Sequence, residues 1–212
     1  IWDVSGDGVV SHCIFVNNSA AIGGVIYCDS DDCVVCDCIF VNNSADDGGV
    51  MYWELNNGNV SSCVFINNSG NNSLIHFRNG PFGKNLSVND NIFLNNDGTV
   101  IYSEYQDSDS NLDYNWFGHN ATNYMDNPNV DGCNVWLFLN STANPNIFPI
   151  LGASDITFKL YAYDSNDVSE YDNSLLKAVD LTVTPTGGQV NSTKVNQGKS
   201  VQYTADDSGL GY

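Results

Sequence analysis

Short runs of apolar residues, separated by glycine-rich and polar turns, recur along the first half of the chain at a nearly constant interval. The run Cys13–Ala20 (CIFVNNSA) returns unchanged after 25 residues as Cys38–Ala45, and after another 25 residues as Cys63–Gly70 (CVFINNSG). A fourth copy, Asn91–Asn96, follows after 28 residues, and a degenerate fifth copy, Asn115–Gly118, begins 24 residues later. An interval this regular indicates one structural unit that is repeated along the chain.

Two further motifs keep the same interval, so each period contains three short apolar runs. Gly23–Tyr27 (GGVIY) returns as Gly48–Tyr52 (GGVMY). A valine recurs at a third phase, at Val10, Val35, Val60 and Val88. These runs are too short for amphipathic helices, and their β-branched and aromatic residues favour strands. Three strands per period with polar corners predict an all-β fold, a right-handed parallel β-helix of about five coils.

The predicted coils place equivalent residues on top of one another, because each coil rises about 4.8 Å above the last. The repeat therefore predicts a buried aromatic column of Phe15, Phe40, Phe65, Phe93 and Phe117. The paired asparagines after each phenylalanine fall at a corner, where stacked amides can hydrogen-bond along the axis and where Asn tolerates left-handed backbone. Gly23-Gly24 and Gly48-Gly49 mark a second corner, at which a Cβ atom would be costly.

A different pattern follows the repeats, whose phase is lost after about residue 120. Cys133–Leu139 predicts a last strand that covers the open end of the stack, as solenoids require. From Ile156 onward, apolar and polar residues alternate, as in Ile156–Leu160 and Val201–Ala205, with Gly187-Gly188 as a turn. This alternation predicts an antiparallel β-sandwich. We expect roughly four of the about seven strands that such a sandwich needs, so the sandwich is expected to be cut short.

Two of the repeated elements resemble the repeats of polymorphic outer membrane proteins. The Phe-x-x-Asn element of those repeats is found at Phe15–Asn18, Phe40–Asn43, Phe65–Asn68 and Phe93–Asn96. Their Gly-Gly-Ala-Ile-like element is matched by Gly23–Ile26 and by Gly48–Met51, where Met replaces the usual Ile.

The chain also resembles the large adhesin-like surface proteins of methanogenic archaea. Tyr114–Gly118 (YNWFG) is similar to the Tyr-Asn-Trp-Trp-Gly-type element that closes the β-helix in that family, although Phe117 stands where Trp is usual. Thr157–Tyr161 through Leu181–Thr184 resembles the immunoglobulin-like domains that follow those β-helices. The resemblance implies an extracellular cell-surface protein that attaches to glycans or proteins of other cells.

The patterns and the resemblance together divide the chain into two expected domains. Residues 1–150 form the β-helix with its closing segment, and residues 151–212 form the truncated immunoglobulin-like β-domain. Ile1-Trp2 stands 25 residues before Ile26-Tyr27, so we expect the chain to start inside a coil and to be a piece of a longer protein.

Charge and composition argue against several classes of function. The chain has 25 acidic and 6 basic residues and a net charge of −19, and a surface this negative repels nucleic acids and anionic membranes. The sequence contains no run of about 18 apolar residues that would span a membrane. Asn-x-Ser/Thr sequons fit an exported glycoprotein, and the alternative is that these asparagines serve turns and ladders. The candidate glycosylation sites are Asn17, Asn42, Asn59, Asn67, Asn71, Asn85, Asn120, Asn140 and Asn191.

The seven cysteines leave more than one interpretation open. Three of them share one repeat phase and are expected to stack in the wall: Cys13, Cys38 and Cys63. Cys28, Cys33, Cys36 and Cys38 form a local cluster without a standard zinc spacing, so small buried apolar side chains are favoured over metal ligands. Cys28 and Cys33 can form a disulfide in an oxidising compartment, whereas an anaerobic one would leave them reduced.

One acidic loop is a candidate calcium site, and calcium is the one candidate cofactor. Its candidate ligands alternate along the chain: Asp107, Asp109, Asn111 and Asp113. The sixth position of this loop is Leu112 instead of Gly, and the twelfth is Gly118 instead of Glu, so the loop is no EF-hand. The alternative is a solvated loop.

Catalysis is a second class of function to weigh, because parallel β-helices also host polysaccharide lyases and hydrolases. A lyase needs cationic groups against a uronate, and residues 1–150 contain only Arg78 and Lys84. A hydrolase needs two carboxylates about 5–9.5 Å apart; Asp46-Asp47 recurs in no neighbouring coil. The three histidines occupy unrelated phases and are interpreted as wall residues: His12, His76 and His119.

We therefore assign no catalytic and no cofactor-binding residue, and we predict a non-catalytic surface module. The alternative is a carbohydrate-active β-helix enzyme. Carboxylates that cluster on one solvent-facing wall beside aromatic residues would favour the enzyme, and a smooth wall with asparagine ladders would favour the surface module.

Overall fold

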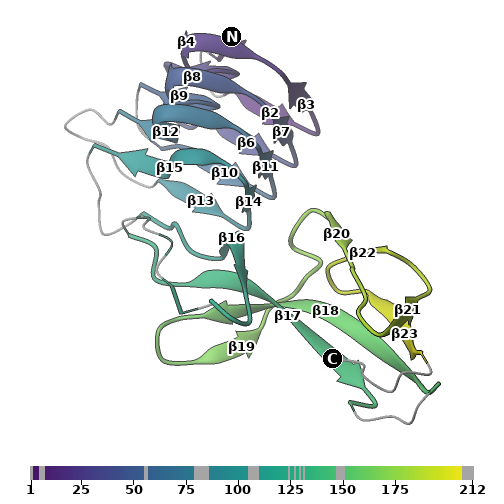
Figure 1. Cartoon of the computed structure of the whole chain (residues 1–212). Coiled ribbons are helices and arrows are strands. Elements are labelled where there is room, and N and C mark those ends of the chain that lie inside the picture. Colours follow the sequence, from purple (N-terminus) through teal and green to yellow (C-terminus); the bar gives the residue numbers. More distant parts are fainter. Residues whose placement is uncertain are drawn as a thin grey trace.

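The computed structural model of the chain describes residues 2–4, 8–54, 57–78, 86–104, 110–123, 125–126, 128, 130, 132–146 and 151–206. In these residues every regular element is a β-strand, which confirms the all-β class (Figure 1). The described part contains no helix that is long and apolar enough to cross a membrane.

The first half of the chain is a β-solenoid of about four turns with three parallel walls. We name the walls by the residue that recurs in each. The valine wall contains β2 (Val9–Ser11), β6 (Val34–Cys36), β10 (Asn59–Ser61) and β13 (Ser87–Asn89). The phenylalanine wall contains β3 (Ile14–Val16), β7 (Ile39–Val41), β11 (Val64–Ile66) and β14 (Ile92–Leu94). The tyrosine wall contains β1 (Trp2–Val4), β5 (Ile26–Cys28), β9 (Met51–Trp53), the second half of β12 (Ser69–Phe77) and the second half of β15 (Asp97–Ser103).

Strand pairing confirms the predicted parallel stack and corrects two details. Strands of successive coils pair in register, as Val10 does with Val35 and Phe15 with Phe40. The stack has about four regular turns instead of the expected five, because the fifth repeat is degenerate and joins the valine wall only through a bridge between Ser87 and Asn111. Trp2 pairs with Ile26 and not with Tyr27, so the first coil is one residue shorter than the repeat interval implies.

The predicted phenylalanine column is present and forms the centre of the core. Neighbouring rings from Phe15 to Phe117 are stacked, with centroids 5.2, 4.9, 4.6 and 5.5 Å apart in chain order. Phe40 and Phe65 are fully buried, and Phe15 and Phe117 at the two ends are partly buried. Rings at this spacing fill the interior and gain stacking energy along the whole solenoid.

The second asparagine of each pair forms a hydrogen-bonded ladder parallel to the phenylalanine column. The Oδ1 atom of Asn43 accepts hydrogen bonds from the backbone N–H and the side-chain amide of Asn18, both at 2.9 Å. The Nδ2 atom of Asn43 donates to the carbonyl of Phe15 and to Oδ1 of Asn68, both at 3.0 Å. Asn68 repeats this pattern with Asn96, so each amide satisfies buried groups of the neighbouring coils.

The first asparagine of each pair has a different task, which is to turn the chain. Asn17, Asn42, Asn67 and Asn95 have φ angles between 54° and 59°, in the left-handed region that Asn tolerates. The glycine corner uses the same conformation at Gly48, where φ is 55°. A Cβ atom at the adjacent Gly49 would lie 2.2 Å from the carbonyl oxygen of Ser69 in the next coil, so that position admits no side chain.

The C-terminal part continues the phenylalanine wall within one ten-stranded sheet (Figure 1). β16 (Asn115–Asn120) and β17 (Trp136–Asn144) pair in parallel, and β18 (Ala153–Tyr163) then pairs antiparallel with β17. The remaining strands are β19 (Val168–Glu170), β20 (Asp180–Thr182), β21 (Gly188–Val190), β22 (Lys194–Asn196) and β23 (Ser200–Ala205). β19, β21 and β23 join the same sheet, and β20 pairs with β22 apart from it.

Residues after β19 pack on the outer face of the phenylalanine wall. Tyr171 and Leu176 join a buried apolar cluster with Val64, Ile92 and Trp116. The predicted closing strand is present as β17, although it extends the wall by pairing at its edge. The domain division at residues 150 and 151, the right-handed winding and the immunoglobulin-like sandwich stay predictions.

Replacing Phe40 by Ala should lower the free energy of unfolding by about 3–5 kcal/mol, because the fully buried ring leaves a cavity between two stacked neighbours. Urea denaturation followed by circular dichroism measures this change. Val16→Ala, at a position that is 47% exposed, is the matched control and should change stability by less than about 1 kcal/mol. Equal effects of the two substitutions would contradict the assigned register.

Replacing Asn43 by Ala should cost roughly 2–4 kcal/mol, because buried ladder groups that lose a partner cost about 1–3 kcal/mol each. Asn42→Gly is the control: Asn42 is exposed, and glycine adopts its left-handed backbone without strain. Thermal unfolding of the two variants should therefore give a large fall in midpoint for the first and almost none for the second. A larger fall in midpoint for Asn42→Gly than for Asn43→Ala would show that the amide ladder does not stabilise this corner.

Candidate functional site

A second aromatic column lies on the outside of the solenoid, along the tyrosine wall. Tyr27 and Tyr52 are stacked at 5.7 Å, the His76 ring lies 4.8 Å from Tyr52, and Tyr102 meets His76 edge-on at 5.0 Å. These residues hold one register position, since His76 pairs with Tyr52 on one side and with Tyr102 on the other. Their neighbours along each strand, such as Met51 and Trp53, point into the core and are fully buried.

Charged residues follow the column at the position where each strand ends. Glu54 accepts a hydrogen bond from Arg78 at 2.7 Å and one from the Tyr27 hydroxyl at 3.2 Å. Burial, reinforced by the nearby Glu54 carboxylate, raises the pKa of Tyr27 and of Tyr52, so both phenols stay protonated in neutral solution. Arg78 holds the equivalent place in the next coil, and Glu104 holds it in the coil after that.

His76 is the centre of the arrangement and is 5% exposed. Its Nδ1 atom lies 2.5 Å from Oδ1 of Asp47, and its Nε2 atom lies 3.6 Å from Oε1 of Glu104. The chain turns at the residue after Asp47, since Gly48 has a φ of 55°, and a Cβ atom on Gly48 would lie 3.0 Å from that of Tyr52. The glycine corner thus brings the end of β8 (Ser44–Asp47) against the aromatic column.

The tyrosine wall therefore offers two kinds of contact to a molecule in solution. Tyr102 is 45% exposed and presents aromatic surface that can pack against the apolar face of a sugar or against another side chain. The Glu104 side chain is 37% exposed and can accept hydrogen bonds from hydroxyl groups. Carboxylates and aromatic residues are thus gathered on one solvent-facing wall.

Sequence reasoning missed most of this site. The sequence predicts His76 to be an ordinary wall residue at a phase unrelated to those of the other two histidines. It does lie in the tyrosine wall, at the position of Tyr52 and Tyr102, but its contacts with Asp47 and Glu104 are not predicted. Asp47 was set aside because it does not recur in neighbouring coils, yet it contacts His76. The available signal was the alignment of Tyr27, Tyr52, His76 and Tyr102 at one phase, which shows an aromatic column outside the core. The other two histidines lie elsewhere, with His12 exposed and His119 buried, where desolvation lowers its pKa.

The candidate calcium loop is only partly described, since Asp107 and Asp109 lie outside the described residues. The Asn111 side chain accepts a hydrogen bond from the backbone N–H of Asp113 at 3.1 Å. The Asp113 carboxylate accepts hydrogen bonds from the backbone N–H groups of Asn134 and Val135, at 2.6 and 2.9 Å. Asp113 thus anchors the segment that leads into β17, and calcium binding at this loop stays a prediction.

The sequon asparagines fall into different environments. Asn17, Asn42 and Asn67 are exposed at the left-handed corners, so ladder geometry explains their presence. Asn71, Asn120 and Asn191 are exposed, Asn59 and Asn140 are half-buried, and Asn85 lies outside the described residues. Glycosylation at any of them stays a prediction.

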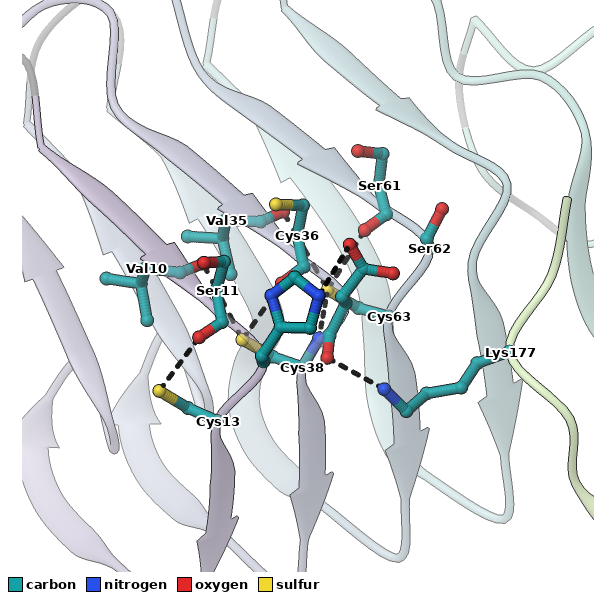
Figure 2. Close-up of polar contacts among 12 residues, drawn as sticks. Val10, Ser11, Cys13, Val35, Cys36, Cys38, Ser61, Ser62, Cys63 and Lys177 are labelled. Atoms are coloured by element: carbon teal, nitrogen blue, oxygen red, sulfur yellow. Dashed lines mark hydrogen bonds and ion pairs between the residues drawn. The ribbon is translucent and has the colours of Figure 1, made fainter.

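Cys13, Cys38 and Cys63 stack at the corner between the valine and phenylalanine walls, as predicted (Figure 2). The Cys63 thiol donates to the carbonyl oxygen of Val35 at 3.7 Å, and the Cys38 thiol donates to that of Val10 at 3.6 Å. At the same phase in later coils, the side-chain amides of Asn91 and Asn115 donate to Val60 and Val88 at 2.8 and 2.7 Å. The thiols therefore replace amides as corner donors, which gives this column an architectural role.

The other four cysteines agree only in part with the interpretation that they are small buried side chains. Cys28 and Cys33 form a disulfide, which is one of the two states that the sequence leaves open, while Cys36 and Cys133 are half-buried free thiols. In the described residues no group of three or more His, Cys, Asp or Glu side chains is arranged around a common point. No known protein family matches the chain, and no curated protein and no solved structure is significantly similar to it.

Cys38 and Cys63 should resist alkylation in the folded protein, because both side chains are fully buried. The interaction with the neighbouring Cys63 side chain lowers the pKa of Cys38 to about 7, so at pH 8 burial and not protonation would protect it. Iodoacetamide labelling at pH 8, read by mass spectrometry, should modify the half-buried Cys13 first. Labelling of Cys36 should be slower, because burial and the nearby Asp37 carboxylate raise its pKa. Labelling of Cys133 should be slow because burial raises its pKa to about 12. Labelling in urea is the control and should reach all five free thiols; rapid native labelling of Cys38 would contradict its placement.

Proposed function

We propose that this chain is a non-catalytic, adhesin-like module of an extracellular cell-surface protein, and that it attaches to glycans or proteins of other cells. The observation that carries the proposal is the asparagine ladder, which is the feature expected of a surface module. The internal phenylalanine column and the asparagine ladder hold the coils together, whereas the outer column ends in the exposed ring of Tyr102 and so is available for contact.

Several features support a surface location for this module. The repeats, the Tyr114–Gly118 element and the C-terminal strands resemble adhesin-like proteins of methanogenic archaea, in which an immunoglobulin-like sandwich follows a right-handed β-helix. The Cys28–Cys33 disulfide fits an oxidising exterior. The net charge of −19 fits a soluble surface that contacts neutral or cationic partners rather than nucleic acid or anionic membrane.

Binding is favoured over hydrolysis by the way the carboxylates are engaged. A glycosidase needs two carboxyl groups that both face the sugar across about 5–9.5 Å. Here Asp47 contacts the imidazole of His76, and Glu54 is held by Arg78 and Tyr27. Among the described residues, the Glu104 carboxylate has no ion pair shorter than its 3.6 Å separation from the Nε2 atom of His76.

A carbohydrate-active enzyme is the second candidate, and one observation favours it. Asp47 and Glu104 lie on opposite nitrogens of a single imidazole ring, beside aromatic residues, on a solvent-facing wall. A hydrolase would need both carboxylates to face the sugar, which requires Asp47 to be released from His76.

The two candidates are separated by measuring binding and product release together, with the purified chain incubated with pectic, host and microbial glycans. We expect binding without turnover, and we expect Tyr102→Ala to weaken binding several-fold, since one aromatic contact contributes about 0.5–1.5 kcal/mol. Leu151→Ala, at a 66% exposed position in another part of the chain, is the control and should bind as the native chain does. Turnover that is abolished by Asp47→Asn would replace the adhesin by the enzyme.

A further inference from the structure

The Nε2 atom of His76 is a buried polar atom without a hydrogen-bond partner among the described residues. The His76 side chain is 7% exposed, and burying an unpartnered polar atom costs free energy, typically about 1–3 kcal/mol. The nearest acidic atom is Oε1 of Glu104 at 3.6 Å, which is too long for a direct hydrogen bond. The position between these two atoms is therefore suited to a bound species that contacts both.

The tautomer of His76 follows from its contact with Asp47. A carboxylate accepts hydrogen bonds, so Nδ1 at 2.5 Å from Asp47 carries the proton and donates it. In the neutral ring the lone pair of Nε2 then faces the carboxylate of Glu104. Two acceptor atoms that face each other repel, and a cation between them removes the repulsion.

We propose that His76 Nε2 and Glu104 bind a divalent transition-metal cation of the Zn²⁺ type, with Asp47 as the residue that orients the imidazole. Zinc bonds of about 2.0–2.2 Å at a tetrahedral angle place two ligand atoms about 3.4 Å apart; the observed separation is 3.6 Å. A carboxylate on the second ring nitrogen is the usual partner of a metal-binding histidine, because it fixes the tautomer and raises the basicity of the ligand.

The surroundings of the site agree with a cation of this class. An imidazole nitrogen selects zinc-like metals over calcium and magnesium, which prefer oxygen ligands alone. Tyr52 and Tyr102 pack on the ring from either side and limit its movement. The guanidinium of the nearby Arg78 is paired with the carboxylate of Glu54 at 2.7 Å, so it is Glu54 and not Glu104 that holds this positive charge. Because the described residues supply two ligands, water completes the coordination, and the outward position would let a partner's ligand replace that water.

The test is a titration of the native chain with Zn²⁺, read at the ring nitrogens of His76 by long-range ¹H–¹⁵N correlation spectra. This readout is specific to the site, so zinc that binds the free thiols does not affect it; His12→Gln and His119→Gln assign the signals. Zn²⁺ should shift Nε2 of His76 and leave Nδ1 protonated. Asp47→Asn should weaken this binding about 10–100-fold.

Glu104→Gln should weaken binding at least as much as Asp47→Asn, because it removes a direct ligand. Asp97→Asn is the matched control: it removes an exposed carboxylate at the start of β15, the strand that Glu104 follows, and should change the affinity less than about twofold. Circular dichroism checks that each variant folds. The proposal is overturned if millimolar Zn²⁺ leaves the His76 signals unchanged, or if Glu104→Gln binds zinc as tightly as Asp97→Asn does.

Discussion

The structure depends on one constraint, which is the in-register stacking of successive coils at the spacing of a β-sheet. Each residue has its own equivalent above and below it, so a polar atom at a corner must be satisfied along the axis of the solenoid. Asparagine meets this demand because one amide both donates and accepts. Asn43 accepts from Asn18 and donates to Asn68, and it also satisfies the carbonyl of Phe15. The phenylalanine column can remain apolar because the ladder beside it takes up these polar groups.

The same constraint explains why cysteine and asparagine exchange at the other corner of the phenylalanine wall. The required function is a donor that reaches a carbonyl of the preceding coil. Asn91 provides it at 2.8 Å from Val60, and the softer and larger sulfur of Cys63 provides it at 3.7 Å from Val35. A thiol is the weaker donor, but it can also fill apolar space. A column of cysteines in a repeat protein can therefore be architectural, without being a metal or redox centre.

Because stacking occupies the interior and the corners, variation is confined to the outward positions. The outer face of the phenylalanine wall is covered where Tyr171 and Leu176 pack against Val64 and Ile92. The tyrosine wall carries an unusual feature for an outer face, a buried histidine between two carboxylates. That histidine stands where the neighbouring coils have a tyrosine. A residue that departs from the repeat on the outer face can make a specific contact without disturbing the stack.

The repeats are enough to predict the solenoid, its phenylalanine column and its asparagine corners, because stacked coils require one residue type at one phase and the local strand and turn preferences agree with it. The sequence overestimated the number of turns, since a degenerate repeat still matches the pattern after it has lost most of its pairing. Only the tertiary structure decided that β17 and β18 share a sheet with the solenoid, because no repeat relates their antiparallel partners. It alone also brought Asp47, His76 and Glu104 together: they come from three different coils, and the glycine corner that the repeat predicts does not reveal which side chains meet beside it.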